Sequence, residues 1–438
     1  MPHLLYIIFA FALGSCVGSF LNVVVWRLPQ VEHKGESWLR DFLQSWQALS
    51  YPPSHCPNCN NRLKWYDNLP VIGWIKLAGK CRFCSEPISM RYPIVEATTG
   101  LLFTFYYVMF FMVGYGPCHE WPAPSGVVVF NQVEMTIIEH WPIYLLDMML
   151  IGALIAATLI DWELFIIPLE IPYFVVPFAL VVHAVWDRPG WPGALNPSPA
   201  AAALAAGAGI GVIISFVLWN LKIIPASFAE GGPLLEIDKA KLKEEQEKKG
   251  RASDQKGPPV EEQEIPEFTP AQIRAEMRKE MLFLIPPMAL GMAWVLLTWK
   301  IPALASWWAG VASIGWVGGL LGSVLGFLVG GFVVWIVRIL GSYGFGREAL
   351  GLGDVHLMAA VGAVLGPGPA TVAFFLAPFF GIARAIVMLF TTKSRELPLG
   401  PYLSMATAVV MVFYCPIANY LSPGIAGLGM VLSQLLGR

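Results

Sequence analysis

Long apolar runs recur along the whole chain, separated by polar segments or by segments rich in glycine and proline. A helix that crosses a membrane needs about 20 consecutive apolar residues, and about ten of the runs approach that length. Their cores lie at residues 4–25, 93–114, 142–160, 167–186, 200–222, 281–299, 311–340, 355–367, 369–390 and 401–421. The pattern predicts an all-α polytopic membrane protein with about ten transmembrane helices.

Two of these runs differ from the rest. The first has no basic residues before it and is followed by Arg27, so we expect an anchor helix rather than a cleaved signal. The run at 355–367 is short, and Gly366-Pro-Gly-Pro369 separates it from the next run. We therefore predict a helical hairpin over 355–390 whose first leg does not span the membrane fully.

Composition agrees with a membrane location. Hydrophobic residues make up 56% of the chain, charged residues only 13%, and the mean hydropathy is +0.61. So little polar surface cannot cover a soluble globule of 438 residues. The net charge of −2 and the absence of a basic stripe outside the loops argue against a nucleic-acid partner.

The distribution of basic residues predicts the orientation, because positively charged loops stay in the cytoplasm. Residues 27–92 contain nine Lys and Arg residues, whereas residues 115–141 contain none. Alternating sides from there places the Asp161 junction, the loop at 223–280, the Arg347 to Asp354 junction and the Lys393/Arg395 loop in the cytoplasm. Both termini are then external.

The same pattern divides the chain into five parts. These are a first transmembrane helix (1–26), a cytoplasmic zinc-binding module (27–92), transmembrane helices that carry a first candidate aspartate (93–222), a charged, partly disordered cytoplasmic insertion (223–280) and transmembrane helices that carry a second (281–438). Within the insertion, the charged run at 238–249 predicts a solvated helix followed by a disordered linker. We expect no catalytic role for this insertion.

Four of the seven cysteines form two CxxC pairs, Cys56/Cys59 and Cys81/Cys84, which are separated by 21 residues. Two such knuckles can complete a tetrahedral site with four thiolates, which predicts a structural zinc ion. A redox pair and cysteines without a metal are the alternatives, and His55 is a competing ligand. A cytoplasmic loop is reducing, so structural disulfides are the less favoured use.

The other three cysteines, Cys16, Cys118 and Cys415, are unpaired in the sequence. We interpret them as apolar packing residues.

Ionisable residues at the edge of a membrane span are candidate functional residues, because they are costly there. The carboxylates that qualify are Asp147, Asp161, Glu163, Glu170 and Asp354. Asp161 and Asp354 both lie at the predicted cytoplasmic boundary on different helices. Two carboxylates at one depth can share a proton and activate water for peptide hydrolysis, as in aspartic proteases.

The other carboxylates fit that chemistry less well. Asp147 precedes Asp161 by 14 residues, and at ~1.5 Å per residue the two lie ~21 Å apart. Glu163 lies two positions after Asp161 and faces the opposite side of a helix. Gly351 and Gly353 remove side chains beside Asp354, which would let a substrate backbone approach it. A solvated helix end remains the simpler interpretation of Asp161 alone.

Other protease chemistries lack their motifs. The sequence has no Gly-x-Ser-x-Gly elbow and no His-Glu-x-x-His pair.

Five ordered motifs resemble those of the bifunctional type IV prepilin peptidases, also called leader peptidase/N-methyltransferases, a family of GxGD aspartic membrane proteases. They are Gly18-Ser-Phe-Leu-Asn-Val-Val-Val-Trp-Arg-Leu-Pro29, the region from Cys56 to Gly100, Ile160-Asp-Trp-Glu-Leu-Phe-Ile-Ile-Pro168, Gly351-Leu-Gly-Asp-Val-His-Leu-Met-Ala359 and Leu397-Pro-Leu-Gly-Pro-Tyr402.

The resemblance implies specific roles. Asp161 and Asp354 would be the catalytic pair, and the four paired cysteines would bind zinc. The substrates would be prepilins or pseudopilins, whose positively charged leader is cut after a glycine at the cytoplasmic face of the bacterial inner membrane. The new N-terminus would then be methylated with S-adenosylmethionine, for which the sequence indicates no binding residues.

The chain departs from the family pattern at three places. His356 stands where the family usually has lysine, and Leu169 replaces a common acidic residue, with Glu170 one position later. Residues 200–299 add two spans to the usual eight, and an even number preserves the sidedness of Asp354.

Three other functions stay open at this point. The carboxylates could serve another GxGD peptidase, or a proton- or ion-coupled transporter, which would place them near the membrane midplane between inverted repeats. A catalytically silent zinc scaffold is the third.

Overall fold

The computed structural model describes residues 2–31, 38–122, 128–132, 134–188, 190–227, 268–391 and 398–435. The expected solvated helix at 238–249, its linker and the Lys393/Arg395 loop lie outside these residues.

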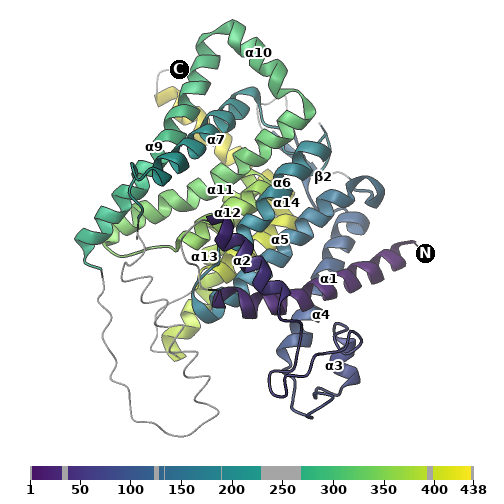
Figure 1. Cartoon of the computed structure of the whole chain (residues 1–438). Helices are drawn as coiled ribbons and strands as arrows, with labels where there is room; N and C mark the ends of the chain where they lie inside the picture. The colour runs from purple at the N-terminus through teal and green to yellow at the C-terminus, as the bar shows by residue number, and fades with distance from the viewer. Residues whose placement is uncertain are drawn as a thin grey trace.

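The described chain is a bundle of long helices with one small module at its side (Figure 1). The first half contains α1 (Pro2–Arg27), α2 (Trp38–Ser50), α3 (Ile72–Lys76), α4 (Arg91–Val108), α5 (Ile137–Leu164), α6 (Glu170–Trp186) and α7 (Pro199–Asn220). The second half contains α9 (Pro270–Lys300), α10 (Pro302–Ala312), α11 (Gly315–Phe345), α12 (Leu352–Leu365), α13 (Pro367–Thr391) and α14 (Gly400–Leu435). A 3₁₀ turn (Leu28–Gln30) follows α1, and a π-helical turn (Met109–Val113) extends α4.

The predicted all-α membrane fold is confirmed. Among the described residues, eight helices are long and apolar enough to cross a membrane, and two shorter apolar helices, α6 and α12, complete the ten predicted runs. α12 has only 14 residues, so it forms the short first leg of the predicted hairpin. Gly366 ends it with a φ of 90°, a left-handed conformation that glycine adopts readily, and Pro367 begins α13.

Two elements were not predicted. β1 (Cys118–Pro122) and β2 (Val128–Gln132) pair antiparallel, with Cys118 opposite Gln132. α9 begins at Pro270, well before the predicted boundary at 280, because Thr269 and Gln272 form a capping box there. The last part of the predicted insertion, residues 270–280, therefore forms about the first three turns of a membrane helix.

α5 is the most deeply buried of the eight spanning helices. Its apolar side chains form one continuous core with α1, α4, α12 and α14. α7, α9 and α10 pack together at one side of this core (Figure 1). Many large apolar side chains on the outside of the bundle are exposed, as a helix that faces lipid requires.

α11 and α12 approach each other through glycines. A Cβ atom at Gly326 would overlap the carbonyl oxygen of Gly362, and a Cβ atom at Gly362 would overlap that of Gly326. Small residues of this kind allow membrane helices to pack backbone against backbone. α11 is thereby fixed against α12, which begins two residues before Asp354.

Candidate active site and cysteine module

Asp161 lies in the last turn of α5 and is buried. The helix ends three residues later because Phe165 adopts a left-handed conformation with a φ of 57°. The Oδ2 atom of Asp161 accepts a hydrogen bond of 2.9 Å from the backbone N–H of Gly400, the first residue of α14. This close approach of Asp161 to residue 400 requires a glycine there, since a Cβ atom at position 400 would lie 2.6 Å from that oxygen.

Asp354 lies in the first turn of α12 and is also buried. Its Oδ2 atom accepts a hydrogen bond of 3.2 Å from the backbone N–H of Gly351, the residue that caps the helix. A carboxylate at this position compensates an unpaired N–H group and is favoured by the helix dipole. His356, two residues farther along, forms a hydrogen bond of 3.2 Å with the hydroxyl of Tyr173.

The two carboxyl groups lie close enough to interact electrostatically, although they belong to different helices. Ile167, in the link between α5 and α6, connects their surroundings. A Cβ atom at Gly353 would lie 2.9 Å from the Cβ atom of Ile167, and one at Gly400 would lie 3.2 Å from its Cδ1 atom. The neighbour that requires a glycine at position 353 is therefore Ile167 of the same chain, not only an approaching substrate.

The other candidate carboxylates have different surroundings. Asp147 is buried in α5, and its Oδ2 atom has no hydrogen-bond partner among the described residues. Glu163 forms an ion pair with Arg91, at the start of α4. Glu170 accepts a hydrogen bond of 3.0 Å from Ser45 in α2.

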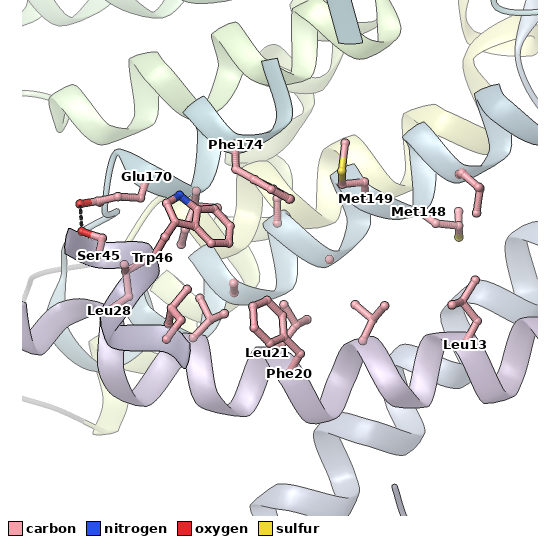
Figure 2. Close-up of a pocket in the computed structure, with 18 of the residues that line it drawn as sticks. Leu13, Phe20, Leu21, Leu28, Ser45, Trp46, Met148, Met149, Glu170 and Phe174 are labelled. Carbon is pink, nitrogen blue, oxygen red and sulfur yellow. Dashed lines mark hydrogen bonds between the residues drawn. The ribbon is translucent and has the colours of Figure 1, made fainter. Parts of the chain in front are cut away.

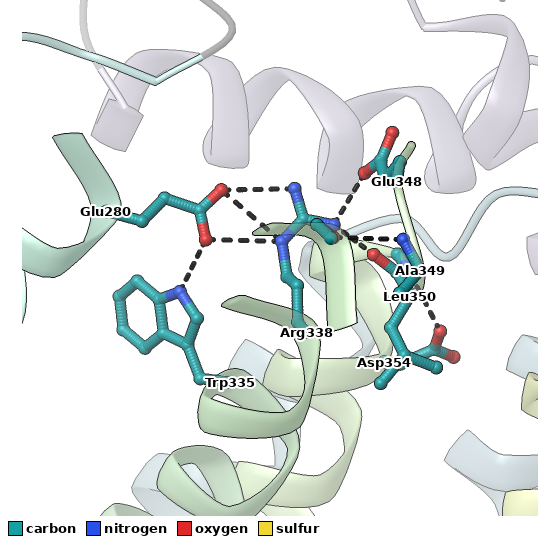
Figure 3. A network of polar contacts seen from close by, with 9 residues as sticks. Glu280, Trp335, Arg338, Glu348, Ala349, Leu350 and Asp354 are labelled. Carbon is teal, nitrogen blue, oxygen red and sulfur yellow. Dashed lines mark hydrogen bonds and ion pairs between the residues drawn. The ribbon is translucent and has the colours of Figure 1, made fainter. Parts of the chain in front are cut away.

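A buried polar network adjoins Asp354, and sequence analysis missed it (Figure 3). Its centre is Arg338 in α11, which contacts Glu280 of α9 and both Glu348 and Leu350 in the segment before α12. A single arginine in an otherwise apolar run was the signal that could have identified it.

The four predicted zinc ligands come together. The sulfur atoms of Cys56, Cys59, Cys81 and Cys84 all lie within 4.8 Å of one another. Cys56 and Cys84 are 3.8 Å apart, and Cys59 and Cys81 are 4.0 Å apart. A tetrahedral zinc ion with Zn–S bonds of about 2.3 Å requires sulfur separations of about 3.8 Å, so the cluster fits this metal. His55 is not in the cluster, and its Nδ1 atom lies 3.0 Å from the carbonyl of Pro53.

Backbone N–H groups of the knuckles point at three of the sulfur atoms. Those of Cys84 and Phe83 lower the pKa of Cys81 to about 6, and that of Asn61 lowers the pKa of Cys59. The backbone of Glu86 acts on Cys84 in the same direction, but burial and the neighbouring thiols raise the pKa of Cys84 to about 11. Backbone hydrogen bonds thus favour the thiolate form of Cys81 and Cys59, whereas burial and crowding among the four thiols disfavour that of Cys84.

A second contact holds the module together. The Arg82 guanidinium donates two hydrogen bonds to the carboxylate of Asp67, one of them 2.9 Å long. This pairing holds the pKa of the Asp67 carboxyl below its usual value. Arg82 lies between Cys81 and Cys84 in sequence, so the ion pair connects the second CxxC knuckle to the rest of the module.

The prediction that Cys118 and Cys415 are unpaired packing residues is wrong, because the two form a disulfide. The β1–β2 hairpin docks on α14, where the side chain of Asn419 bonds both the N–H and the carbonyl of Phe130, at 2.8 and 2.7 Å. This docking brings the two cysteines together. Cys16 is exposed on α1, so it does not pack inside the bundle either.

The disulfide and the cysteine module lie at opposite ends of the bundle. Arg91, which begins α4 directly after the module, pairs with Glu163 next to Asp161. The hairpin with Cys118 follows the far end of α4. We call the first end, which carries Asp161, Asp354 and the module, the aspartate end.

An apolar cavity of about 340 Å³ lies between α1, α2, α5 and α6. Figure 2 shows residues that line it. Leu21, Trp46 and Phe174 line it, and the Ser45–Glu170 hydrogen bond lies at one end. Its lining does not include Asp161 or Asp354. The cavity is therefore separate from the carboxylate pair.

Fold and site together define a polytopic helical membrane protein with a buried carboxylate pair and a four-cysteine module at one end. Comparison with known proteins identifies a related family for one part of the chain. Residues 12–110, from α1 to the end of α4, match the bacterial peptidase A24 N-terminal domain.

Relatives match over a similar length. The chain is 46% identical over 99 residues to a prepilin leader peptidase/N-methyltransferase of Myxococcus xanthus, which covers 23% of this chain and 25% of that protein. It is 44% identical over 96 residues to a type 4 prepilin-like proteins leader peptide-processing enzyme of Escherichia coli, covering 20% and 35%. It is 41% identical over 123 residues to a prepilin leader peptidase/N-methyltransferase of Klebsiella pneumoniae, covering 28% and 47%.

The matched part thus spans between a quarter and just under half of the length of these relatives. No solved structure matches the chain. The resemblance to prepilin peptidases is confirmed for the region with the cysteine module, which precedes both aspartates.

Proposed function

We propose that this protein is a prepilin leader peptidase, an aspartic endopeptidase that cuts the leader from type IV prepilins or pseudopilins. The observation that carries the proposal is the pair of buried carboxylates at one end of the bundle, in a chain whose first quarter matches peptidase A24. Asp161 and Asp354 are the catalytic residues in this proposal, and Gly351 and Gly353 support the second of them.

The mechanism follows from two adjacent carboxyl groups that share one proton. The ionised carboxyl takes a proton from water, and the resulting hydroxide attacks the carbonyl carbon of the scissile peptide. The protonated carboxyl donates its proton to the carbonyl oxygen. Collapse of the resulting gem-diol breaks the C–N bond. The amine leaves with a proton from the carboxyl that accepted it, and one gem-diol hydroxyl returns its proton to the other carboxylate, which gives the carboxylic acid product and restores the pair with one shared proton.

The decisive experiment is cleavage of a co-expressed prepilin, measured as a gel shift. We expect cleavage by the wild type and none by Asp161→Asn or Asp354→Asn, with membrane insertion verified for each. Asp147→Asn is the matched control, because it makes the same change in a buried aspartate outside the pair. Cleavage by either pair variant would refute the assignment.

We propose that the four cysteines hold a structural zinc ion. Their separations fit a closed tetrahedral site, and such a site leaves no position for a reacting water. The ion would stabilise a module that otherwise has one short helix, α3, between the two knuckles.

We further propose that the aspartate end faces the cytoplasm and that the protein lies in the bacterial inner membrane. Free thiols are kept in reducing compartments, and disulfides persist in oxidising ones. The four thiols lie at the aspartate end, and the Cys118–Cys415 disulfide lies at the other end. This arrangement agrees with the orientation that the basic residues predict.

N-methylation of the mature substrate with S-adenosylmethionine is a second candidate activity. It is supported by the names of the relatives from Myxococcus xanthus and Klebsiella pneumoniae. Mass spectrometry of the mature N-terminus tests it, since methylation replaces one hydrogen of the amine with a methyl group and adds the mass of one CH2 unit.

The alternative of an ion-coupled transporter is less well supported. A transporter places its ion-binding carboxylates near the membrane midplane. Here Asp161 lies in the last turn of one helix and Asp354 in the first turn of another.

A further inference from the structure

Arg338 is a fully buried arginine in a membrane helix. Only 1% of its side chain is exposed, although α11 is otherwise apolar on all sides. Charges in such helices are expensive and are tolerated where they are paired and serve a function. The proposed catalytic mechanism does not use this residue, so its contacts need another explanation.

One side of the guanidinium binds a glutamate of α9. Nη2 donates to Oε1 of Glu280 at 3.1 Å, and Nε donates to Oε2 at 3.2 Å. Trp335, one turn earlier on α11, donates its indole N–H to the same Oε2 atom at 2.7 Å. Glu280 is itself buried, with 2% of its side chain exposed. These bonds fix the plane of the guanidinium.

The other side holds the segment that leads into α12. Nη1 donates to Glu348 at 2.5 Å and also to the carbonyl oxygen of Leu350. Nearby, the N–H of Ala349 donates to Ser342 of α11 at 2.9 Å. Figure 3 shows the guanidinium between Glu280 and this segment.

The carbonyl of Leu350 and the N–H of Gly351 belong to the same planar peptide group. Arg338 binds the carbonyl, and the N–H donates to Oδ2 of Asp354 at 3.2 Å. Fixing the carbonyl therefore fixes the direction of the N–H that holds Asp354. A charged donor on the carbonyl also polarises the peptide and strengthens the bond on its other side.

We infer that Arg338 is a positioning residue for Asp354, acting through the Leu350–Gly351 peptide, and that Glu280 of α9 in turn positions Arg338. This inference rests on the proposed function and extends it to α9. The first turns of that helix were expected to belong to an insertion without a catalytic role. They carry the carboxylate that orients the arginine.

The first test variant is Arg338→Lys, which keeps the charge but loses the planar fork. The lysine side chain is shorter and ends in a single ammonium group, which cannot bind both Glu280 and the Leu350 carbonyl. Misplacing a reacting group by about 1 Å can cost about 100-fold in rate. We expect kcat for prepilin cleavage by purified enzyme to fall about 10- to 100-fold, with KM changed less than about 2-fold.

The second variant is Glu280→Gln, which keeps one acceptor oxygen, so we expect a smaller loss of kcat in the same direction. The matched control is Glu276→Gln on the same helix. It makes the same chemical change in a glutamate that pairs with Lys279 at 2.6 Å. Rates are normalised to folded enzyme, so that a variant that folds poorly is not counted as a slow one.

Hydrogen exchange of residues 346–355 provides a readout that does not depend on any substrate. We expect faster exchange there in Arg338→Lys than in the wild type or in Glu276→Gln. Unchanged kcat and unchanged exchange in Arg338→Lys would overturn the inference, as would a loss of kcat that Glu276→Gln shows equally. If the wild type does not cleave prepilin, the proposed function fails, and exchange alone then decides the positioning role.

Discussion

Gly400→Ala is the sharpest available perturbation of the proposed catalytic pair. A Cβ atom at position 400 would lie 2.6 Å from Oδ2 of Asp161, whereas ordinary van der Waals contact begins near 3.4 Å. The carboxylate must therefore move by about 0.8 Å, or else its hydrogen bond from the backbone N–H of residue 400 must break. Either change alters the position of the oxygen that exchanges protons with water.

A displacement of this size predicts the magnitude of the effect. Since misplacement by about 1 Å can cost about 100-fold, we expect kcat to fall about 10- to 100-fold, or about 1.4 to 2.7 kcal/mol in activation free energy. The backbone itself accepts alanine, because the φ of Gly400 is not in the left-handed region. The fold should therefore not be destabilised through the backbone.

The assay is cleavage of purified prepilin in detergent, with the thermal stability of each variant measured alongside. Gly310→Ala is the matched control, because nothing lies within 4 Å of its added Cβ atom. Gly351→Ala should have a smaller effect than Gly400→Ala, since its Cβ atom would lie 3.3 Å from Oδ2 of Asp354. If folded Gly400→Ala cleaves at the wild-type rate, the close approach of Asp161 to residue 400 has no catalytic importance, and the predicted dependence of kcat on this contact is refuted.

Three further predictions concern the parts outside the pair. Cys59→Ser should reduce bound zinc from about one ion per chain to almost none, measured by elemental analysis; an unchanged zinc content would argue against the site. The low pKa of Asp67 means that its ion pair stabilises the module fully above about pH 4 and is lost as the pH falls through the lower folded value. Asp67→Asn should therefore make the module more sensitive to limited proteolysis at neutral pH, with no difference from the wild type in strong acid; equal sensitivity at neutral pH would contradict this. Cys118 and Cys415 should react with an external membrane-impermeant maleimide only after reduction, and labelling without reduction would disprove the external disulfide.

The membrane helices could be predicted because the signal is local. An apolar run of about 20 residues identifies a span whatever its neighbours are, and all ten predicted runs are helical. The cysteine module was predictable for a similar reason, since each CxxC pair already places two thiols together. The boundary at 280 was misplaced because the capping box at Thr269 begins a helix whose first turns are polar.

Partners that are distant in sequence could not be found in this way. Asp161 meets the N–H of Gly400 across 239 positions, and Cys118 meets Cys415 across 297. No spacing rule applies over such lengths. The bond to Gly400 also uses the backbone, which leaves no mark in the sequence beyond the glycine itself.

The buried arginine was a different kind of omission. Arg338 stands inside the predicted span at 311–340, and Glu280 lies one residue before the predicted span at 281–299. A lone charge in a span was a recognisable signal, but only carboxylates were compared. Its partner, Glu280, was assigned to the charged insertion at 223–280.

The glycine contact between α11 and α12 means that Arg338 and Asp354 sit on one interlocked piece of the protein. With Gly326 and Gly362 pressed backbone to backbone, neither helix can slide or turn past the other without a clash. Asp161 sits on another piece, α5. Any change in the spacing of the two aspartates, whether to admit a peptide or to release one, must therefore displace the whole α11–α12 unit against α5. A bulky residue at position 326 or 362 would misalign the proposed catalytic pair from the far half of α12, without contacting Asp161 or Asp354.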